Sequence, residues 1–223
     1  MIPKIIHYCW FGGKEKPASF SAYLATWKKY LPDFEIREWN ESNFPIGEYR
    51  YACEAYAMGD FAFVSDVARL HALFMEGGIY LDTDVELINN FDSYLGCESF
   101  VGRESEFVGT AVIGAEPSLN WINRFLDYYK RRHFVNLFGH PVRTANAKIL
   151  TLKILPSVSD EDYPVVFEKG YLSCKDYRTG EISVRPGAAA IHHFEASWKY
   201  RKSIKTRLKT LIKGLKTRYL STK

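Results

Sequence analysis

The chain has 223 residues, of which 47% are hydrophobic and 16% aromatic, so it can bury one substantial core and we expect one domain of catalytic size. The formal net charge of +4 is unevenly distributed, because residues 199–223 contain ten Lys or Arg and no Asp or Glu. Residues 1–198 therefore hold 20 basic and 26 acidic side chains, a net charge of −6. An acidic body without a nucleic-acid-binding motif excludes nucleic acid as the expected partner.

No apolar stretch is long enough to cross a bilayer, since the longest runs, such as 79–81 and 188–191, contain only a few residues. The N-terminus lacks an apolar segment followed by a cleavage site, so we expect the protein to stay on the side of the membrane where it is made, the cytoplasm. The four cysteines show no CxxC pair and no zinc-type spacing, which indicates free thiols in a reducing compartment.

Strand and helix signals alternate through the first sixty residues. The opening segment 2–10 is rich in β-branched and aromatic residues and runs into the pair Gly12–Gly13, the pattern of a buried strand that enters a loop. Apolar residues at helical spacing predict a helix over 20–31. A second strand is predicted over 34–39 and a short helix over 49–58.

The clearest helix is predicted over Ser65–Glu76, with its apolar residues on one face and Gly77–Gly78 as the stop. A strand over Ile79–Leu81 follows at once. This alternation of strand and helix indicates a mainly parallel sheet covered by helices, and such sheets bind ligands beyond the carboxyl ends of their strands. Asp82 and Asp84 lie at such an end.

The second half of the chain shows weaker periodicity. Strands are predicted over 99–102, 107–114, 164–172 and 188–193, and helices over 119–131 and 144–155. No internal repeat or low-complexity segment precedes the basic tail.

Asp82 and Asp84 are the first candidates for chemistry. Two aspartates separated by one residue at the end of an apolar strand converge on one point, and their hard oxygens suit Mg²⁺ or Mn²⁺ bound together with a diphosphate. Such an ion can neutralise a departing nucleotide diphosphate. An acidic pair on a solvated turn is the common alternative, but the apolar flanks in GGIYLDTDVEL favour a functional site.

Asp66 and Arg69 lie upstream and three residues apart, so the predicted helix places them on one face near its N-terminus. There a carboxylate can accept hydrogen bonds from sugar or ribose hydroxyls, and a guanidinium can bind phosphate or sugar oxygens through two donors. An ordinary ion pair on the helix surface is the alternative that these two residues alone would favour.

Three motifs in a fixed order carry a resemblance to a known family. They are IPKIIHYCWFGG at 2–13, SDVARLHALFMEGGIYLDTDVEL at 65–87 and AIHHFEASW at 190–198, and together they span nearly the whole acidic body. With this set the chain resembles the DxD-containing, glycosyltransferase family 32-like sugar transferases, which include bacterial capsule and lipopolysaccharide transferases and yeast initiating mannosyltransferases. It resembles the glucosyltransferase domains of large clostridial toxins more distantly.

The resemblance implies an α/β fold of the glycosyltransferase A type, which is Rossmann-like with a mainly parallel central sheet and helices on both faces. This single catalytic domain would cover residues 1–198 and transfer a hexose with retention of anomeric configuration. Trp10, at the end of the first strand, would stack on the nucleotide base, although the residue alone would favour a core aromatic. Asp66 and Arg69 would hold the donor sugar and ribose, and Arg69 would help to stabilise the leaving diphosphate.

The same resemblance implies a site for Mn²⁺ or Mg²⁺. Asp82 would contact the ribose and the metal's shell, Asp84 would ligate the metal directly, and His193 would complete the site. Adjacent strand residues face opposite ways, so only one of His192 and His193 is expected to reach the metal. Periodicity leaves that choice open, and the resemblance selects His193. Trp198 would close over the diphosphate and exclude water.

The donor implied is a nucleotide sugar, with a UDP-sugar favoured and GDP-mannose also compatible. The acceptor implied is a saccharide or lipid-linked saccharide in capsular polysaccharide or lipopolysaccharide synthesis, bound by variable loops such as Gly139–Asn146. Two other classes stay open at this point. An aspartate-based phosphohydrolase also places DxD after an apolar strand, but Glu86 stands where that class has Thr or Val. The other class is a non-enzymatic module that binds anionic lipid.

The tail 199–223 is predicted to form a basic amphipathic helix. Apolar residues recur along it at helical spacing and Lys or Arg fill the remaining surface, whereas Gly214 weakens the helix. Such a helix can bind an anionic membrane surface, which predicts a cytoplasmic protein that is peripheral on the inner face of the plasma membrane. The alternatives are a disordered tail and an apolar stripe that packs against the body.

Overall fold

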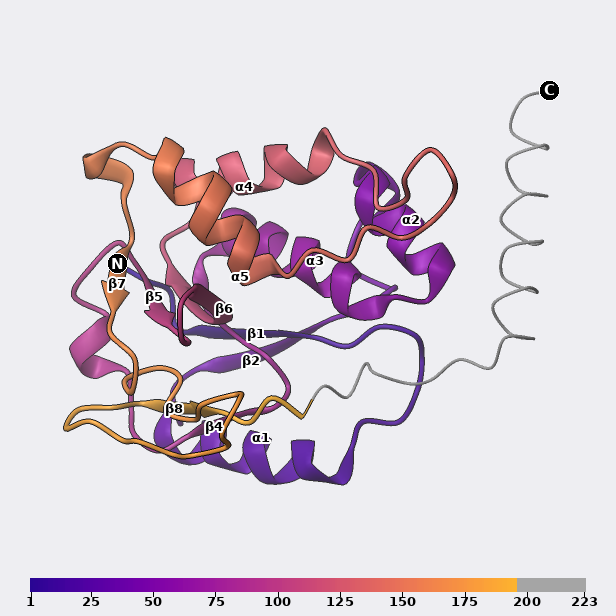
Figure 1. Ribbon diagram of the computed structural model, residues 1–223. Helices are drawn as coiled ribbons and strands as arrows, with labels where there is room; N and C mark the ends of the chain where they lie inside the picture. Colours follow the sequence, from indigo (N-terminus) through magenta and orange to yellow (C-terminus); the bar gives the residue numbers. More distant parts are fainter. Residues whose placement is uncertain (196–223) are drawn as a thin grey trace.

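The structure is a computed structural model of the chain, and it describes residues 1–195. The predicted closing residue Trp198, the domain boundary at 198 and the amphipathic helix over 199–223 lie outside the described residues. The described part is an α/β fold built on a six-stranded sheet with helices on both faces (Figure 1). Among the described residues, no helix combines the length and the apolar character needed to span a membrane.

The central sheet has the order β2-β1-β3-β6-β5-β7 and is parallel except for one strand. Its strands are β1 (Ile5–Cys9), β2 (Glu35–Trp39), β3 (Gly78–Leu81), β5 (Ser99–Arg103), β6 (Val108–Ala115) and β7 (Val165–Phe167). β6 runs antiparallel to its neighbours β3 and β5, while the pairs β1–β2, β1–β3 and β5–β7 are parallel. The predicted α/β class with a mainly parallel sheet is confirmed, and β1 is an internal strand.

Helices cover both faces of this sheet (Figure 1). They are α1 (Ala18–Tyr30), α2 (Arg50–Met58), α3 (Phe61–Glu76), α4 (Asn120–Lys130) and α5 (Asn146–Ile149). A π-helical turn at Leu150–Ile154 and a 3-10 turn at Leu155–Ser157 extend α5, and further 3-10 turns lie at Ile46–Glu48, Asp92–Tyr94 and Asp160–Asp162. α1 lies on one face of the sheet, and α2 to α5 lie on the other.

A second sheet consists of two antiparallel strands, β4 (Val85–Leu87) and β8 (Ala190–His192). It lies on the same side of the central sheet as α1 (Figure 1). Trp27 of α1 donates from Nε1 to the carbonyl oxygen of Val85 at 2.8 Å, which fixes β4 to this helix. β4 was not predicted from the sequence, because a strand of three residues directly after an acidic pair shows no usable period.

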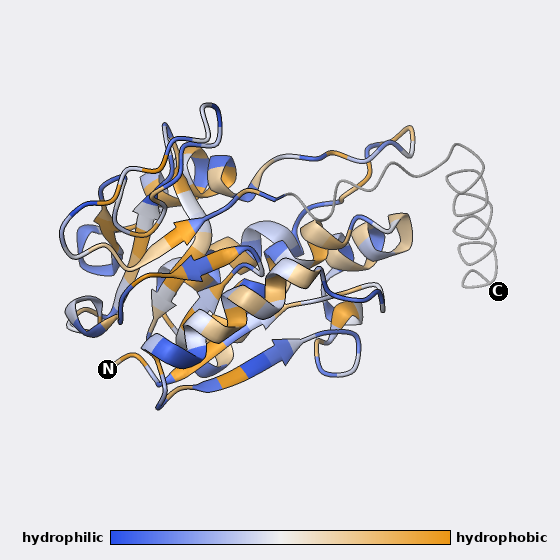
Figure 2. Ribbon diagram, turned by 90° about the horizontal axis from the view of Figure 1, so that it is seen from below, coloured by the Kyte–Doolittle hydropathy of each residue, from blue (hydrophilic) through white to orange (hydrophobic). Residues whose placement is uncertain are grey.

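Two apolar layers enclose the central sheet. Leu70 of α3 and Trp121 of α4 belong to the layer on one face, and Trp27 of α1 and Leu81 of β3 belong to the layer on the other. Figure 2 shows that hydrophobic residues concentrate on the central strands. This is the distribution expected for a sheet that is buried on both faces.

The helix α3 begins at Phe61, four residues before the predicted start at Ser65. Serine often caps a helix, but the Ser65 Oγ bonds to the Phe61 carbonyl oxygen at 3.1 Å, one turn back within the helix. Asp66 and Arg69 consequently lie in the body of α3 and not near its N-terminus, which corrects the prediction. Both side chains are almost fully buried, so they do not form a surface ion pair.

Two glycines connect α3 to β3. Gly77 ends the helix at φ 64° and Gly78 follows at φ 105°, both in the region that favours glycine. A Cβ on Gly78 would lie 2.6 Å from the carbonyl oxygen of Ile5, so β3 can pack against β1 only with glycine here. The predicted helix stop is confirmed, and β3 carries the chain directly to Asp82 at the carboxyl edge of the sheet.

His7 in β1 is fully buried and joins three elements. Trp39 of β2 donates from Nε1 to His7 Nδ1 at 3.0 Å, so His7 Nε2 carries the ring proton and donates it to the Gly77 carbonyl oxygen at 2.7 Å. Burial lowers the pKa of His7, although the backbone hydrogen bond to Gly77 acts in the opposite direction. The folded state therefore favours the neutral ring.

We expect acid to destabilise the fold through His7. Because the folded-state pKa lies below the ordinary value of 6.5, the unfolded chain binds more protons as the pH falls through 6.5, and stability is lost there. His7→Gln leaves Trp39 Nε1 without its acceptor, so we expect it to cost about 1–3 kcal/mol of unfolding free energy at neutral pH. It should also weaken the dependence of stability on pH below neutrality.

Urea unfolding over a series of pH values measures both effects. His140→Gln, at an exposed position of a loop, is the matched control. An equally steep pH dependence in His7→Gln and the wild type would show that His7 is not responsible.

Candidate active site

Asp82, Asp84 and His192 meet at the carboxyl end of β3. Asp82 directly follows β3, Asp84 directly precedes β4, and His192 is the last residue of β8. Antiparallel pairing of β4 with β8 places His192 opposite Val85, next to Asp84. One ligand atom from each of the three side chains lies within 4.8 Å of the others, and His192 Nε2 is 3.4 Å from Asp84 Oδ1. Two motifs that are distant in sequence thus form one cluster.

The structure brings His192, and not the expected His193, to the two aspartates. Adjacent residues of the extended chain do face opposite ways, but His192 is the one that faces the two aspartates. The His193 ring stacks on Tyr23 of α1, with ring centroids 4.8 Å apart, and its Nε2 lies 2.8 Å from Glu86 Oε2. Its backbone N–H donates to the Asp84 carbonyl oxygen at 2.9 Å. His193 therefore supports the backbone of the cluster, and its side chain points elsewhere.

The Arg69 guanidinium lies buried between Asp66 and Asp82. Its Nη2 is 3.1 Å from Asp66 Oδ1 and 3.2 Å from Asp82 Oδ1. Its Nη1 donates to the Thr110 carbonyl oxygen at 2.6 Å, and its Nε donates to the Ser65 carbonyl oxygen at 3.2 Å. All three nitrogens have acceptors within the protein. Arg69 thus holds two carboxylates of the site in fixed positions.

Tyr80 completes the surroundings of Asp82. Its hydroxyl donates to Asp82 Oδ1 at 2.8 Å, and the guanidinium carbon of Arg69 stands 4.5 Å from the centre of its ring. Tyr80 is 1% exposed and Arg69 is 5% exposed, so these contacts are shielded from water. A charge over an aromatic face is most favourable under such conditions. The carboxylate of Asp82 is therefore oriented before any ligand binds.

The three carboxylates differ in how readily they ionise. Burial raises the pKa of Asp66 to about 7, although the charge of Arg69 acts to lower it. Burial also raises the pKa of Asp82 against the same charge. Burial acts to raise the pKa of Asp84 as well, but hydrogen bonds from His192 and the Glu195 backbone lower it below its ordinary value. Asp84 is therefore the most readily ionised of the three.

His192 lies between two carboxylates, because its Nδ1 is 2.9 Å from Glu104 Oε1 while its Nε2 faces Asp84. Burial acts to lower the pKa of His192, but the charges and hydrogen bonds of Glu104 and Asp84 raise it to about 10. The protonated ring thus balances the two acids when no cation is bound. A divalent cation in the cluster supplies positive charge in its place and requires a neutral ring nitrogen.

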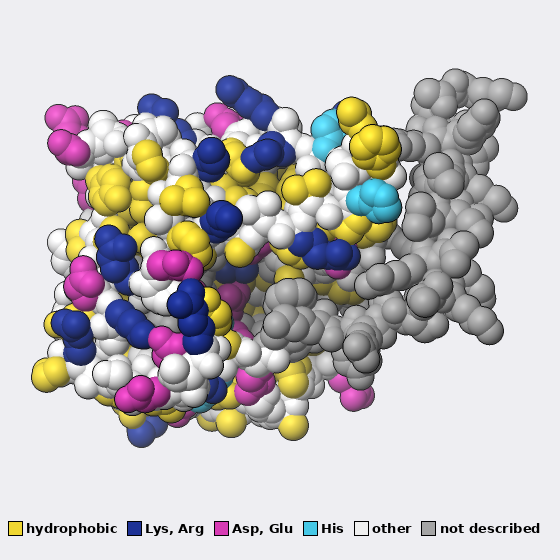
Figure 3. All heavy atoms as spheres, in the orientation of Figure 1, with side chains coloured by type: hydrophobic (Ala, Val, Ile, Leu, Met, Phe, Trp, Pro, Cys, Tyr) yellow, Lys and Arg dark blue, Asp and Glu magenta, His cyan; other side chains and the backbone are white. Residues whose placement is uncertain are grey.

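A cavity of about 1510 Å³ opens beside the cluster. It exceeds the roughly 300–1,000 Å³ of an ordinary small-ligand site and can hold more than one substrate. Its lining brings together the predicted residues Trp10, Asp66, Arg69, Asp82 and Asp84, and it also contains His192. The face drawn in Figure 3 is hollowed near its centre, with charged side chains of both signs around the hollow.

Trp10 lies just beyond β1 at the wall of this cavity. Its backbone N–H donates to the Trp39 carbonyl oxygen at 2.9 Å, which extends the pairing of β1 with β2. Its Nε1 donates to the Lys14 carbonyl oxygen at 2.6 Å, so the polar edge of the indole is already bonded. The indole is therefore held in place at the edge of the cavity.

Four further residues complete the site without having been singled out from the sequence. Tyr80 and Thr110 contact Arg69. Glu104 contacts His192, and the backbone N–H of Glu195 donates to Asp84 Oδ2 at 2.9 Å. Tyr80 and Glu195 lie inside the quoted motifs, so the motifs could have indicated them. Thr110 and Glu104 lie outside every motif, and nothing in their local pattern marks them.

The residues of the cluster fit a divalent cation. Two carboxylates and one imidazole offer three ligand atoms within 4.8 Å of one another. Carboxylate oxygens suit Mg²⁺ and Mn²⁺, whereas an imidazole nitrogen favours a transition ion. Three protein ligands leave further coordination positions for oxygens of a bound diphosphate. The donor set thus suits a divalent cation.

Residues 17–101, which include α1, α3 and the pair Asp82 and Asp84, match the family described as the glycosyltransferase sugar-binding region containing a DXD motif. This match confirms the predicted resemblance to the DxD-containing glycosyltransferases and supports the predicted enzyme class. Curated protein sequences gave no match.

Two solved structures of glycosyltransferases match the chain. One is the PaToxG glycosyltransferase, which is 22% identical with a TM-score of 0.49 over 56% of this chain and 59% of that chain. Another is a glycosyltransferase involved in the glycosylation of the major capsid of PBCV-1, 12% identical with a TM-score of 0.46 over 77% of this chain and 85% of that chain. The match to the first of these structures thus spans 59% of its length.

We expect the site to depend on Arg69 for its stability. Arg69→Met leaves Asp66 and Asp82 buried without their counter-charge, which should lower the unfolding free energy by about 3–5 kcal/mol. Arg69→Lys keeps the charge but loses the planar fork, so its loss should be smaller. Urea unfolding measures both against Arg50→Met, which removes an exposed arginine of α2. A stable Arg69→Met variant would contradict the role given to this guanidinium.

Proposed function

We propose that the chain is a metal-dependent, retaining glycosyltransferase that moves a hexose from a nucleotide sugar to a saccharide or lipid-linked saccharide acceptor. The observation that carries the proposal is the cluster of Asp82, Asp84 and His192 in the wall of the cavity. The match of the surrounding region to DXD-containing glycosyltransferases supports it. Retention of configuration rests on the resemblance of the three motifs.

In this proposal Asp82, Asp84 and His192 hold Mn²⁺, or Mg²⁺ in its place. The cation supplies the charge that neutralises the diphosphate as the sugar departs. Arg69 keeps Asp82 and Asp66 oriented, since its own donors are engaged within the protein. Asp66 lines the cavity and has a pKa of about 7, so its carboxyl can accept or donate a hydrogen bond to a sugar or ribose hydroxyl.

In this proposal the nucleotide base stacks on Trp10, at the cavity wall just beyond β1. A flat ring fixed at the cavity wall supports this role, because stacking needs an aromatic face whose orientation is set in advance. The resemblance favours a UDP-sugar, with GDP-mannose also compatible.

In this proposal Trp198, which lies outside the described residues, covers the donor site. Glu195 anchors the chain after β8, because its Oε1 accepts a hydrogen bond from Tyr23 at 2.5 Å and its Oε2 accepts one from Ser19 at 2.8 Å. Its backbone N–H also binds Asp84. The chain thus leaves the cluster from a fixed point, which supports a role for Trp198 in covering the diphosphate and excluding water.

The acceptor binds along Gly139–Asn146, which contributes several residues to the cavity wall. The preceding turn is held by Asn136, whose Oδ1 accepts hydrogen bonds from the backbone N–H groups of Phe138 and His140, both at 3.0 Å. This turn presents Leu137 and Phe138 to solvent, 102% and 84% exposed. Apolar side chains held out beside the cavity favour an acceptor with an apolar part. A lipid-linked saccharide of capsular polysaccharide or lipopolysaccharide synthesis has that character.

The direct test is release of nucleoside diphosphate from a panel of UDP- and GDP-sugars, with and without Mn²⁺. Asp84→Asn removes a charged ligand without opening a core cavity, so we expect turnover to fall about 100-fold or more, with a loss of unfolding free energy of about 1–3 kcal/mol because the pairing with His192 is weakened. Metal-dependent activity that survives in Asp84→Asn would refute the site.

The two histidines provide a matched pair for the same assay. His192→Ala should weaken the dependence on Mn²⁺ more than His193→Ala does, because His192 alone of the two belongs to the cluster. The opposite order would return the ligand role to His193.

The proposal includes peripheral association with the cytoplasmic face of the plasma membrane through residues 199–223. Ten cations without an acid support it, because each Lys or Arg near an anionic surface contributes about 1 kcal/mol. We expect the full chain to co-sediment with anionic vesicles at low salt and a chain that ends at Trp198 to remain in solution. Neutral vesicles and high salt are the controls, and equal binding by both chains would exclude this anchor.

A further inference from the structure

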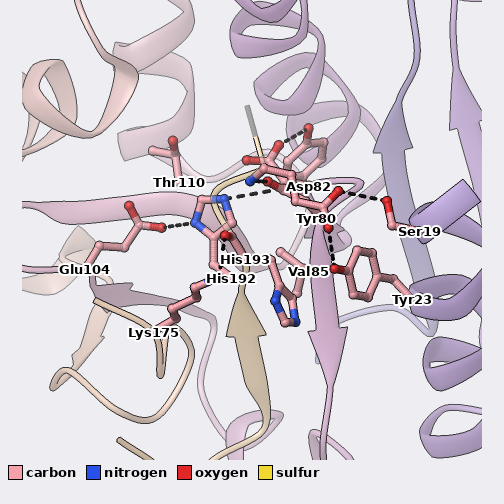
Figure 4. A network of polar contacts seen from close by, with 12 residues as sticks. Ser19, Tyr23, Tyr80, Asp82, Val85, Glu104, Thr110, Lys175, His192 and His193 are labelled. Atoms are coloured by element: carbon pink, nitrogen blue, oxygen red, sulfur yellow. Dashed lines mark hydrogen bonds and ion pairs between the residues drawn. The ribbon is translucent and has the colours of Figure 1, made fainter. Parts of the chain in front are cut away.

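Glu104 faces the His192 ring (Figure 4), on the nitrogen that does not face Asp84. Its Oε1 is 2.9 Å from His192 Nδ1, while His192 Nε2 is 3.4 Å from Asp84 Oδ1. The Glu104 side chain is 17% exposed and lines the cavity. It belongs to none of the three motifs, and the function proposed above gives it no role.

Three features of the backbone place Glu104 there. The pairing of β5 with β6 shifts register between Val101 and Arg103, directly before Glu104, and such irregularities re-aim a side chain. The following turn is closed by the Glu104 N–H, which donates to the Phe107 carbonyl oxygen at 2.9 Å. Gly109 leaves the space that the Glu104 side chain fills, since a Cβ there would lie 2.4 Å from Glu104 Cδ. The fold thus accommodates this carboxylate beside His192.

Glu106, in the same turn, shows the contrast. Its side chain is 57% exposed, and its Oε1 is 3.0 Å from Nη2 of Arg178, which is itself 60% exposed. An ion pair of this kind contributes little to stability or to the geometry of a site. Glu104 differs because it is mostly buried and directed at one ring nitrogen. The two acids, two residues apart, form a natural pair of test and control.

We propose that Glu104 is a positioning residue that holds His192 for cation binding, an inference that rests on the metal site of the proposed function. A carboxylate that accepts a hydrogen bond from Nδ1–H fixes the ring plane and assigns the proton to Nδ1. The lone pair of Nε2 then faces Asp84 and the cation. Loss of such a carboxylate typically lowers metal affinity about 10–100-fold. Glu104 acts through His192.

The test is Mn²⁺ binding to the full chain without donor or acceptor, measured by calorimetry or by the electron paramagnetic resonance signal of free Mn²⁺. Glu104→Ala should lower the affinity about 10–100-fold. Glu104→Gln keeps an oxygen that can accept from Nδ1–H, so it should lower the affinity less. Glu106→Gln is the control and should leave the affinity unchanged.

Gly109→Ala tests the same idea without changing Glu104. The three atoms nearest to the added Cβ all belong to the flexible side chain of Glu104, so the fold can adjust while the carboxylate is displaced. We expect lower Mn²⁺ affinity in this variant as well, with an unfolding midpoint in urea close to that of the wild type. Should Glu104→Ala fail to fold, Glu104→Gln and Gly109→Ala still decide the question.

Failure of this inference is distinguishable from failure of the proposed function. If the wild type binds Mn²⁺ and Asp84→Asn does not, unchanged affinity in Glu104→Ala, or in Glu104→Gln and Gly109→Ala, would overturn the role of Glu104 alone. If the wild type binds Mn²⁺ no better than Asp84→Asn does, the metal site itself is overturned, and the inference falls with it.

Discussion

The buried guanidinium of Arg69 is the contact on which the candidate site depends. It binds Asp66 within α3 at 3.1 Å and reaches to the carboxyl edge of the sheet, where it binds Asp82 at 3.2 Å. Burial alone pushes both carboxyls towards their neutral forms, because a charge is poorly solvated there. The charged guanidinium of Arg69 opposes that tendency and orients both carboxylates. Among the described contacts Arg69 does not bind Asp84, whose carboxylate faces His192 instead.

The small sheet of β4 and β8 provides the second constraint. Its register places His192 opposite Val85, so the three paired residues of β8 bring the motif that begins at Ala190 to Asp82 and Asp84. Trp27 holds β4 from the side of α1, and the His193 N–H binds the Asp84 carbonyl oxygen. The cluster is therefore supported by backbone contacts that do not require a bound ligand. Such preorganisation matters because hydrogen-bond donors and charges that are already placed need little rearrangement during reaction.

Sequence periodicity was sufficient to predict the strands and helices that carry the acidic residues. The apolar strand before Asp82 and the helix before it have strong, regular patterns, and the Gly77–Gly78 stop fixes their junction. The start of α3 was placed four residues late, because Phe61–Val64 is apolar throughout and Ser65 resembles a cap. Its true position matters, since it puts Asp66 and Arg69 in the core.

The choice between the two histidines could not be made from the sequence. Alternation states that adjacent residues face opposite ways, but which one faces the aspartates depends on the register of β8 against β4. β4 is too short to show a period, so that register was invisible. Glu104 lay beyond prediction for a related reason, because its position depends on a register shift in β5 and on the absence of a side chain at Gly109.

The measurement that tests the central claim most directly is diffraction near the manganese absorption edge from crystals grown with Mn²⁺ and UDP. The account predicts one anomalous peak at the end of β3, bound by Asp84 and His192 Nε2 with Asp82 beside it, and diphosphate oxygens completing the coordination. A manganese ion bound elsewhere, or UDP bound without any ion at these residues, would contradict the account.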